Sequence, residues 1–321
     1  MKPATDITEF PHGGMALPPL VDRAIRRAAE SEARTPSRLR DFYELTKPRM
    51  NLLVVITTLV GFFMAAKNTA ILNWALLAHV IFGTALTAAG ASVLNQYVER
   101  DLDRLMPRTA NRPLPTGRIQ AIEALSLGVA FSAVGVLYLA IFVNPLTALL
   151  GAATLGSYVW VYTPMKRVTT LCTIVGAIPG AIPPMMGFTA LNGQISAKAL
   201  ALFGILFLWQ MPHFLAIAVM YKDDYAAGGF KMLPCVDPDL RATGRQIVVY
   251  ALALIPVSLM PFGLRMAGVA YLGGAIILGG IFLSFGILAA MSRSRNDARK
   301  LFFVSIIYLP LLLGLLMLDK A

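Results

Sequence analysis

Long apolar segments constrain this chain more than any other feature of its sequence. About 20 consecutive apolar residues cross the hydrocarbon core of a bilayer as an α-helix. We place such segments at 49–66, 74–98, 121–142, 145–164, 171–190, 199–220, 246–264, 268–291 and 301–318. No soluble domain fits between them, so the sequence predicts an all-α, polytopic membrane protein that forms a single nine-helix bundle.

The composition agrees with this interpretation. Only 14% of the residues are charged and 57% are hydrophobic, whereas about 25% of the residues of a soluble domain are charged. The net charge of +11 comes from Lys and Arg residues scattered between the apolar segments. This pattern sets membrane topology and does not indicate a nucleic-acid partner. Cys172 and Cys235 are too few for a disulfide framework or a cysteine metal site.

The distribution of Lys and Arg predicts the orientation. If the segments alternate across the membrane, all of the 28 Lys and Arg residues fall on one side except Lys67, Lys198, Arg265 and Lys320. Because positive residues concentrate on the cytoplasmic side, we expect the N-terminus to be cytoplasmic and the C-terminus to lie outside. Both acidic clusters described below then share the cytoplasmic face.

The first 40 residues differ from the rest. They are polar, mixed in charge and contain prolines, and they lack the apolar core of a secretory signal. We expect residues 1–40 to form a partly disordered cytoplasmic tail, with a short basic helix around Val21–Arg38 at the membrane surface. Residues 41–321 then form the intramembrane domain.

Polar and acidic residues form a stripe where the second apolar segment ends. At 100° per residue, Asn95, Glu99 and Asp103 fall within an arc of about 80° on one helix face, whereas Asp101 points elsewhere. Acids at the ends of membrane helices are functional candidates, and hard oxygen ligands suit Mg²⁺ shared with substrate phosphates. A solvated helix end paired with its own arginines explains the acids alone equally well.

The loop after this stripe favours a phosphate site. Arg108 and Arg112 are spaced for bidentate contacts to phosphate oxygens. The loop also contains three prolines, which restrict its backbone. A loop that only sets topology needs positive charge but has no need of stiffness.

A second acidic cluster follows the sixth apolar segment. Asp223 and Asp224 are candidates for a second Mg²⁺ contact, although a solvated helix end balanced by its own lysines remains an equal alternative. Four further cations on the same predicted face are candidates for the diphosphate: Lys166, Arg167, Lys222 and Lys231.

Two features within the membrane are candidates for a substrate cavity. The segment from Gly176 to Gly187 is rich in Gly and Pro, and irregular backbone at membrane depth lines a cavity or is buried in protein. His213 lies about ten residues before the second acidic cluster. It is either a hydrogen-bonded structural residue or a contact to a porphyrin or its iron.

These motifs resemble those of the UbiA superfamily of intramembrane prenyltransferases and, within it, the protohaem IX farnesyltransferases. The resemblance spans roughly residues 40–318. It rests on Asn95–Asp103 (NQYVERDLD), Arg108–Leu114, Tyr162-Thr163 with Lys166-Arg167, Gly176–Gly187, Trp209–Phe214 (WQMPHF) and Tyr221–Tyr225 (YKDDY).

The resemblance implies a bundle of the UbiA type and transfer of the farnesyl group of farnesyl diphosphate to a vinyl group of haem b, with water addition, to give haem O. It implies Mg²⁺ as cofactor, held by Asn95, Glu99, Asp103 and Asp224. It also implies a bacterial inner (cytoplasmic) membrane location, with haem A synthase or oxidase assembly factors as partners. Two positions depart from the superfamily pattern. Glu99 stands where Asp is usual, and Gly228 stands where a second acid would follow Asp224.

Two other functions stay open on the sequence. A prenyltransferase for an aromatic or quinone-precursor acceptor would keep both acidic clusters but would have no use for His213. A transporter could also contain duplicated helices and acids, but it would place polar groups near mid-membrane. Here the acids gather at one end of the helices, which favours an enzyme.

Overall fold

The structure is a computed structural model that describes residues 37–66 and 72–321. Residues 41–321 form one compact unit. The tail expected at 1–40, with its basic helix around 21–38, lies almost entirely outside the described residues. The first described helix is α2 (Arg38–Leu45).

In the described ranges, nine helical segments are long and apolar enough to cross a membrane, which confirms the predicted helix bundle. They are α3 (Pro48–Ala65), α4 (Trp74–Asp103), α5 (Ala121–Phe142), α6 to α7 (Pro145–Met165), α8 to α9 (Cys172–Asn192), α10 (Ala197–Met220), α13 (Arg241–Gly263), α14 (Val269–Ser292) and α15 (Arg295–Leu318). Two short helices, α11 (Lys222–Ala227) and α12 (Leu233–Val236), follow α10. Apart from these helices, the described residues contain one isolated β-bridge, between Ala267 and Lys320.

Polar caps fix where several helices begin. The side chain of Asn73 accepts a hydrogen bond from Leu76 N at 3.0 Å, and Asn144 accepts one from Thr147 N at 2.8 Å. Ser294 accepts one from Asp297 N at 3.1 Å. Each cap satisfies a backbone N–H that has no partner within its helix. These contacts set the helix starts independently of hydropathy.

Three helices extend beyond the boundaries that hydropathy predicts. α4 continues to Asp103, α13 begins at Arg241 and α15 begins at Arg295. In each case the helix continues through a charged turn, because backbone hydrogen bonds do not depend on side-chain polarity. The extension of α4 places the whole acidic stripe on regular helix.

Two membrane segments have irregular backbone. In the fourth, α6 (Pro145–Gly156) passes into a π-helical stretch, η1 (Ser157–Tyr162), and then into the short α7 (Thr163–Met165). The fifth breaks at Ile182 into α8 (Cys172–Ala181) and α9 (Pro183–Asn192). The break agrees with the Gly- and Pro-rich sequence, since Pro183 cannot donate a helical hydrogen bond.

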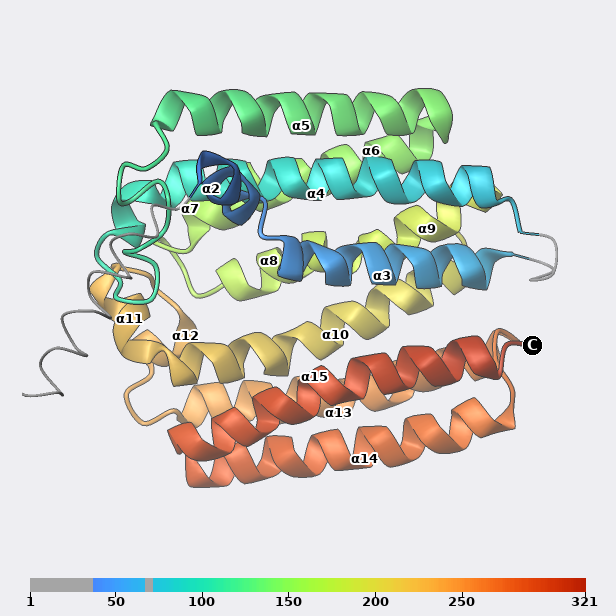
Figure 1. The fold of residues 1–321 in the computed structure, drawn as a ribbon. Helices are drawn as coiled ribbons and strands as arrows, with labels where there is room; N and C mark the ends of the chain where they lie inside the picture. The colour runs from blue at the N-terminus through green and yellow to red at the C-terminus, as the bar shows by residue number, and fades with distance from the viewer. Residues whose placement is uncertain (1–36, 67–71) are drawn as a thin grey trace, which may run out of the picture. The chain divides into compact units, whose positions relative to one another are not determined.

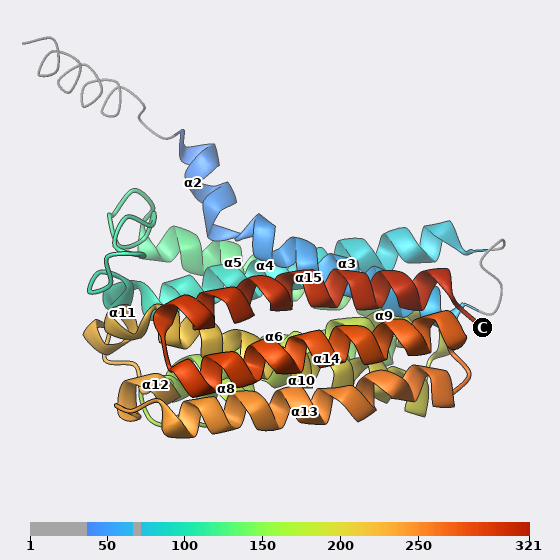
Figure 2. The same cartoon turned by 90° about the horizontal axis from the view of Figure 1, so that it is seen from below.

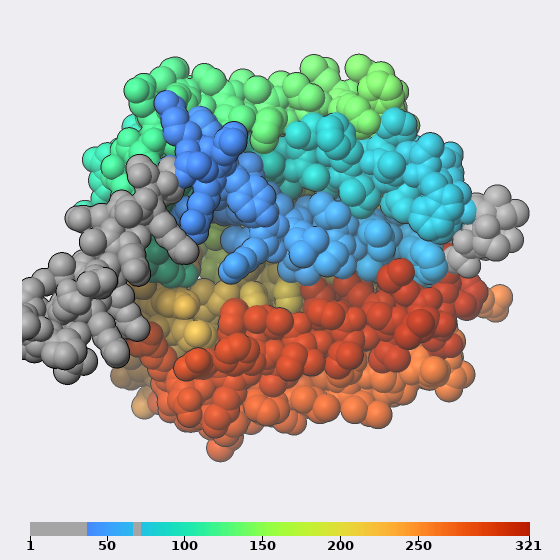
Figure 3. All heavy atoms as spheres, in the orientation of Figure 1, coloured from blue at the N-terminus to red at the C-terminus, as the bar shows by residue number. Residues whose placement is uncertain are grey.

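The helices run side by side along one axis (Figure 1). α4 packs between α3 and α5, while α13, α14 and α15 group with α10. The α8–α9 segment is the most enclosed of the nine, because 72% of the residues in its apolar stretch are buried inside the molecule. α11 lies at one end of the bundle and the last residue of the chain lies at the other (Figure 2). The space-filling view shows α15 beside α3 on one face (Figure 3).

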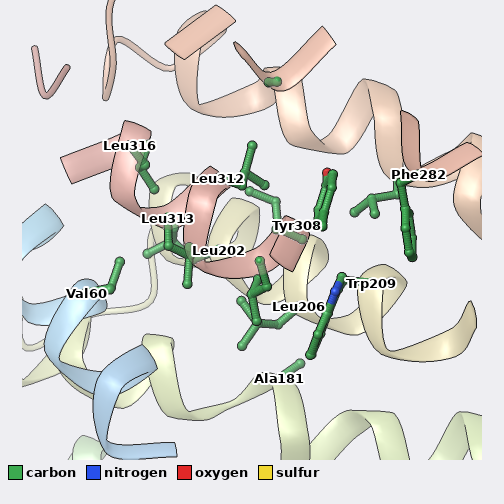
Figure 4. Packing of buried hydrophobic residues seen from close by; sticks show 14 of the residues in the cluster. Val60, Ala181, Leu202, Leu206, Trp209, Phe282, Tyr308, Leu312, Leu313 and Leu316 are labelled. Carbon is green, nitrogen blue, oxygen red and sulfur yellow. The ribbon is translucent and has the colours of Figure 1, made fainter. Parts of the chain in front are cut away.

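The largest apolar core joins α10 to α13, α14 and α15. Figure 4 shows Leu206 and Trp209 of α10 beside Tyr308 and Leu312 of α15. The indole of Trp209 donates a hydrogen bond to Ser305 O at 2.9 Å. This bond satisfies a polar group that would otherwise be buried without a partner.

Two glycines allow α3 and α9 to meet backbone to backbone. A Cβ atom added at Gly61 would overlap the carbonyl oxygen of Pro184, and one added at Gly187 would overlap that of Thr58. The two contacts come from opposite helices and lie close together. They leave no room for α3 and α9 to slide or rotate independently.

Candidate active site

The acidic stripe lies on one buried face at the end of α4. The exposed fractions of Asn95, Glu99 and Asp103 are 1%, 5% and 1%. Asp101 is exposed and pairs with Arg100 at 3.6 Å. The structure thus separates the three residues of the stripe from the solvated acid beside them, as the helical spacing predicts.

Each buried acid is paired with a cation from another segment. Lys166 Nζ donates to Glu99 Oε1 at 2.7 Å, and Arg112 Nη1 donates to Asp103 Oδ2 at 2.8 Å. Burying a lone charge is unfavourable, so these pairs are what allow the acids to be enclosed. Two of the predicted diphosphate cations therefore contact the acidic stripe directly.

Asn95 connects the stripe to two further segments. Its amide nitrogen donates to Glu99 Oε2 at 3.0 Å and to Thr163 Oγ1 at 3.1 Å. Its amide oxygen accepts a hydrogen bond from Lys47 Nζ at 2.8 Å. All polar atoms of the Asn95 side chain are therefore engaged, which fixes its orientation.

Lys47 is a site residue that the sequence analysis missed. It is the residue just before α3, its backbone is in the left-handed region with φ of 47°, and its side chain makes no capping hydrogen bond. Burial, together with the smaller effect of the nearby Arg112 cation, lowers its pKa to about 7. The signal in the sequence was a Lys-Pro pair at the start of the first apolar segment, which also fits a plain topology signal.

The charges of this cluster do not balance. When Lys47 is protonated, the cluster holds three cations against the two carboxylates of Glu99 and Asp103, which leaves one excess positive charge. Because the pKa of Lys47 is about 7, a bound anion would favour this protonated form. A buried excess of positive charge attracts an anion. The cluster is therefore suited to a polyanionic substrate group, and a diphosphate has that character.

The oxygen ligands fit a magnesium ion shared with such a group. Mg²⁺ binds through one or two carboxylates and completes its shell with waters and phosphates. Asp103 Oδ1 accepts no hydrogen bond from the described residues, and its carboxylate remains available on that side. Within residues 37–66 and 72–321, no group of three His, Cys, Asp or Glu residues forms an all-protein metal cage. This donor set fits a metal that arrives with the substrate.

The loop after α4 links the two acidic motifs. The guanidinium of Arg108 lies 4.6 Å from the ring centre of Tyr221 and 5.3 Å from that of Tyr225. Its Nη2 also lies 3.4 Å from the Tyr225 hydroxyl. These cation–π contacts hold the loop against α11. Of the two predicted arginines, Arg112 contacts an acid and Arg108 contacts the second motif.

The second acidic motif lies next to the first without joining it. Asp224 is partly buried and Asp223 is exposed, and neither forms an ion pair within the described part of the chain. The backbone N–H of Lys231 donates to Lys166 O at 2.7 Å, so the loop after α11 contacts the lysine that pairs with Glu99. The free carboxylate of Asp224 is thus available for a ligand.

Gly228 explains one departure from the superfamily pattern. The residue is buried, and an added Cβ would lie 3.0 Å from Met106 Sδ. A carboxylate at this position would have to displace Met106 from a buried apolar cluster. The close approach of Met106 therefore disfavours the second acid that the pattern would place here.

Besides Arg108, which contacts the second motif, three of the predicted diphosphate cations do not contact the stripe. The side chains of Arg167 and Lys231 are exposed, and that of Lys222 is partly buried. None of the three forms an ion pair with a described acid. Within the described residues, the cation that contacts Asn95 is Lys47, which was not among the predicted cations.

The π-helical stretch sets the positions of two site residues. Tyr162 ends η1, and Lys166 Nζ lies 4.6 Å from the centre of its ring. Thr163 follows, and its hydroxyl donates to Tyr158 O at 2.8 Å while it accepts from Asn95. A Cβ added at Gly176 of α8 would overlap the Tyr162 ring. π-Helical turns are frequent at functional sites because they redirect side chains.

His213 faces α15 in the apolar core. Its Nδ1 lies 2.7 Å from Ser305 Oγ, and its ring stacks between Trp209 and Phe302 at 5.0 and 5.1 Å between centroids. The Ser305 hydroxyl donates its one proton to Phe302 O at 2.5 Å, so it accepts from His213 Nδ1–H. This tautomer leaves Nε2 unprotonated, which is the form that ligates iron.

Comparison with known proteins identifies the family. The UbiA prenyltransferase family model matches residues 54–307. The chain is 50% identical over 291 residues to the protoheme IX farnesyltransferase of Solibacter usitatus, covering 88% of this chain and 99% of that one. It is 43% identical over 286 residues to the enzyme of the same name from Myxococcus xanthus, covering 89% and 96%.

Solved structures show the same fold at low sequence identity. A structure of digeranylgeranylglyceryl phosphate synthase superposes with a TM-score of 0.73 at 17% identity and covers 88% of this chain and 98% of its own. A UbiA homologue from Archaeoglobus fulgidus bound to DMAPP and Mg²⁺ gives a TM-score of 0.61 at 17% identity, covering 86% and 99%. The match to the family model and the identity to these relatives show that this chain belongs to the UbiA prenyltransferase family.

Proposed function

We propose that this protein transfers the farnesyl group of farnesyl diphosphate to a vinyl group of haem b, with addition of water, to give haem O. The proposal is supported by the relatives named protoheme IX farnesyltransferase and by their coverage of most of this chain. The observation that carries it is the cluster of three cations and two carboxylates at one end of an apolar bundle.

The first step breaks the bond between C1 of the farnesyl chain and the diphosphate oxygen, and the bonding electrons leave with the diphosphate. Lys47, Arg112 and Lys166 are placed to stabilise the charge that develops on this leaving group. Asn95, Glu99, Asp103 and Asp224 would hold Mg²⁺. When bound, the metal would supply Lewis-acid stabilisation of the same diphosphate oxygens.

The second step forms a carbon–carbon bond. The terminal carbon of the haem vinyl group supplies its π electrons to C1 of the allylic cation, which leaves positive charge on the vinyl carbon next to the porphyrin ring. Water adds there and loses a proton, giving the hydroxyl group. The apolar helices around the site exclude bulk water from the first cation.

His213 is the candidate contact for the haem iron. Its Nε2 is unprotonated in the tautomer that the Ser305 hydrogen bond selects, and no described residue donates to it. A hydrogen bond to the opposite ring nitrogen is the usual way in which proteins orient an imidazole ligand. Stacking on the rings of Trp209 and Phe302 would hold the imidazole ring of His213 in a fixed orientation.

The positive-inside rule supports a location with the acidic end on the cytoplasmic side of a bacterial inner membrane. Among the described Lys and Arg residues, only Lys198, Arg265 and Lys320 belong to the opposite end. The product would then be available to a haem A synthase or to oxidase assembly factors. An aromatic acceptor is the main alternative, because the cation cluster recognises diphosphate and not the acceptor.

The test is a reaction with purified protein in detergent, Mg²⁺, farnesyl diphosphate and haem b, followed by mass spectrometry of the extracted haem. Haem O formed by the wild type and lost in Asp103→Asn supports the proposal. Asp101→Asn is the matched control on the same helix turn, since Asp101 is exposed. If the enzyme instead prenylated a phenolic acid and left haem b unchanged, the acceptor would be an aromatic compound and the haem proposal would be wrong.

A further inference from the structure

A polar cavity lies at the end of the bundle opposite the acidic stripe. It has a volume of about 230 Å³, and its lining includes Lys198, Arg265, Lys320 and Asn192. Lys198 lies in the first turn of α10, Arg265 in the connection from α13 to α14, and Lys320 just after α15. No Asp or Glu side chain is among its described lining residues.

The fold holds this cavity in shape. The Ala267–Lys320 bridge, with a hydrogen bond from Gly268 N to Asp319 O at 2.8 Å, ties the end of the chain to the connection between α13 and α14. Lys320 Nζ then reaches across to the end of α3, where it donates to Phe63 O at 2.6 Å and to Ala66 O. An ammonium group has three donors, so one N–H of Lys320 remains for a ligand.

Arg265 adopts a conformation that is unfavourable for its residue type. Its φ is 54°, in the left-handed region, where a residue with a Cβ is uncommon. Its guanidinium is exposed and forms no ion pair with a described acid. This conformation ends α13 and places the charged side chain at the mouth of the cavity.

The cations of the cavity repel each other. Partial burial lowers the pKa of Lys320, and the Lys198 cation lowers it further. An anion in the cavity would remove this repulsion and would accept hydrogen bonds from both lysines. Met64, Phe188 and Met266 form an apolar wall beside the cations, so the cavity suits a group that is anionic at one end and apolar at the other.

The location argues against a role in topology. Positive residues set orientation by collecting on one side of a membrane, and these cations lie on the opposite side from most of the others. They lie at the ends of helices that cross the bilayer, where lipid headgroups are found. Basic pockets between membrane helices on the cytoplasmic side bind phosphate headgroups, and the same contacts between cations and phosphate can form at the headgroups of the other leaflet.

We propose that this cavity binds the phosphate of an anionic phospholipid headgroup, with Lys198, Arg265 and Lys320 as its ligands and the Met64–Phe188–Met266 wall against the start of the acyl chains. The ligand chemistry is a phosphate group, and the apolar wall favours a lipid over a soluble phosphate. The site is separate from the acidic stripe and independent of the acceptor that the enzyme prenylates.

The experiment uses the full chain and measures lipid retention by native mass spectrometry. Protein is released from nanodiscs of phosphatidylcholine that contain phosphatidylglycerol, and the apparent affinity for each lipid is determined. The variants are Lys198→Gln, Arg265→Gln and the double variant. The matched control is Arg245→Gln, an exposed arginine near the other end of α13 that also lacks an ion pair with a described acid.

Loss of one charged hydrogen-bonding partner should weaken phosphatidylglycerol binding about tenfold, with phosphatidylcholine and the control unchanged. Lys198→Gln is expected to fold, because the side chain forms no hydrogen bond with a described residue. Equal phosphatidylglycerol affinity in wild type and double variant would overturn the site. Inorganic phosphate binding as tightly as phosphatidylglycerol would overturn the lipid as its source.

Discussion

Lys47 Nζ lies 2.8 Å from Asn95 Oδ1, although the two residues are 48 positions apart in the chain. The contact joins the first turn of α3 to the acidic stripe of α4. Asn95 also donates hydrogen bonds to Glu99 and Thr163. The hydrogen bonds of this one side chain therefore connect the ends of three membrane segments. The site is therefore assembled by the bundle and not by a single loop.

Replacing Lys47 by Gln should reduce kcat/KM for farnesyl diphosphate about tenfold to a hundredfold, because a charged contact to the leaving group is lost. Arg49→Gln is the control, since Arg49 is exposed and only two residues away. Steady-state kinetics in detergent measure both. Equal losses in the two variants would mean that total charge near α3 matters and the Asn95 contact does not.

The isosteric changes Glu99→Gln, Asp103→Asn and Asp224→Asn should each lower turnover about a hundredfold or more, since each removes a carboxylate for Mg²⁺–diphosphate. Chelation of divalent metal should abolish wild-type turnover, and added Mg²⁺ should restore it. Product formation is followed by mass spectrometry. Full activity of all three variants would remove the metal assignment.

Replacing Arg112 by Lys keeps the positive charge but loses the planar donor pair. We expect KM for farnesyl diphosphate to rise about tenfold while the orientation in the membrane stays the same. Arg104→Lys, just before the same loop, is the control, because Arg104 is exposed and its side chain bonds only Pro115 O among the described residues. Unchanged KM in Arg112→Lys would limit this arginine to topology and to pairing with Asp103.

Introducing an acid at Gly228 should destabilise the protein by about 1–3 kcal/mol, because the new side chain must displace Met106. The measurement is the thermal unfolding midpoint in detergent. Met106→Ala in the same chain should recover part of the loss, and Ala227→Asp, at an exposed neighbour, should have little effect. A Gly228→Asp protein as stable as wild type would show that Met106 can move aside without a loss of stability.

His213→Ala should weaken haem b binding and shift its Soret absorption, with farnesyl diphosphate affinity near that of wild type. Ser305→Ala removes the acceptor that selects the Nδ1–H tautomer, so we expect a smaller shift in the same direction. An unaltered haem spectrum in both variants would leave His213 as a packing residue between α10 and α15.

The sequence predicted the bundle because hydropathy and helix length are local properties of the chain. It also predicted that Asn95, Glu99 and Asp103 share one face, since a spacing of four residues places them together on any helix, but it left open whether that face is buried. It did not predict Lys47 or the π-helical turn before Thr163. Both depend on which helices become neighbours, and a lysine at a membrane boundary has an ordinary explanation in topology.

The sequence also provided no means of ranking the cations. Arg112 and Lys166 contact the acids, whereas Arg167 and Lys231 are exposed, although all four lie on the same predicted face. Lys166 and Arg167 lie in the turn that follows α7, where adjacent side chains point in different directions. Only the packing of α7 against α4 decides which of the two turns inward.

The glycine contact between α3 and α9 has a consequence for how mutations in this protein should be interpreted. Gly61 lies 14 residues, or about 21 Å along the helix, from Lys47. A helix transmits displacement along its length, so a larger side chain at Gly61 or Gly187 would move the lysine without touching any substrate. In a genetic screen, such alleles would resemble catalytic mutants while lying at the far end of the membrane, and distance from the site would be a poor guide to their cause.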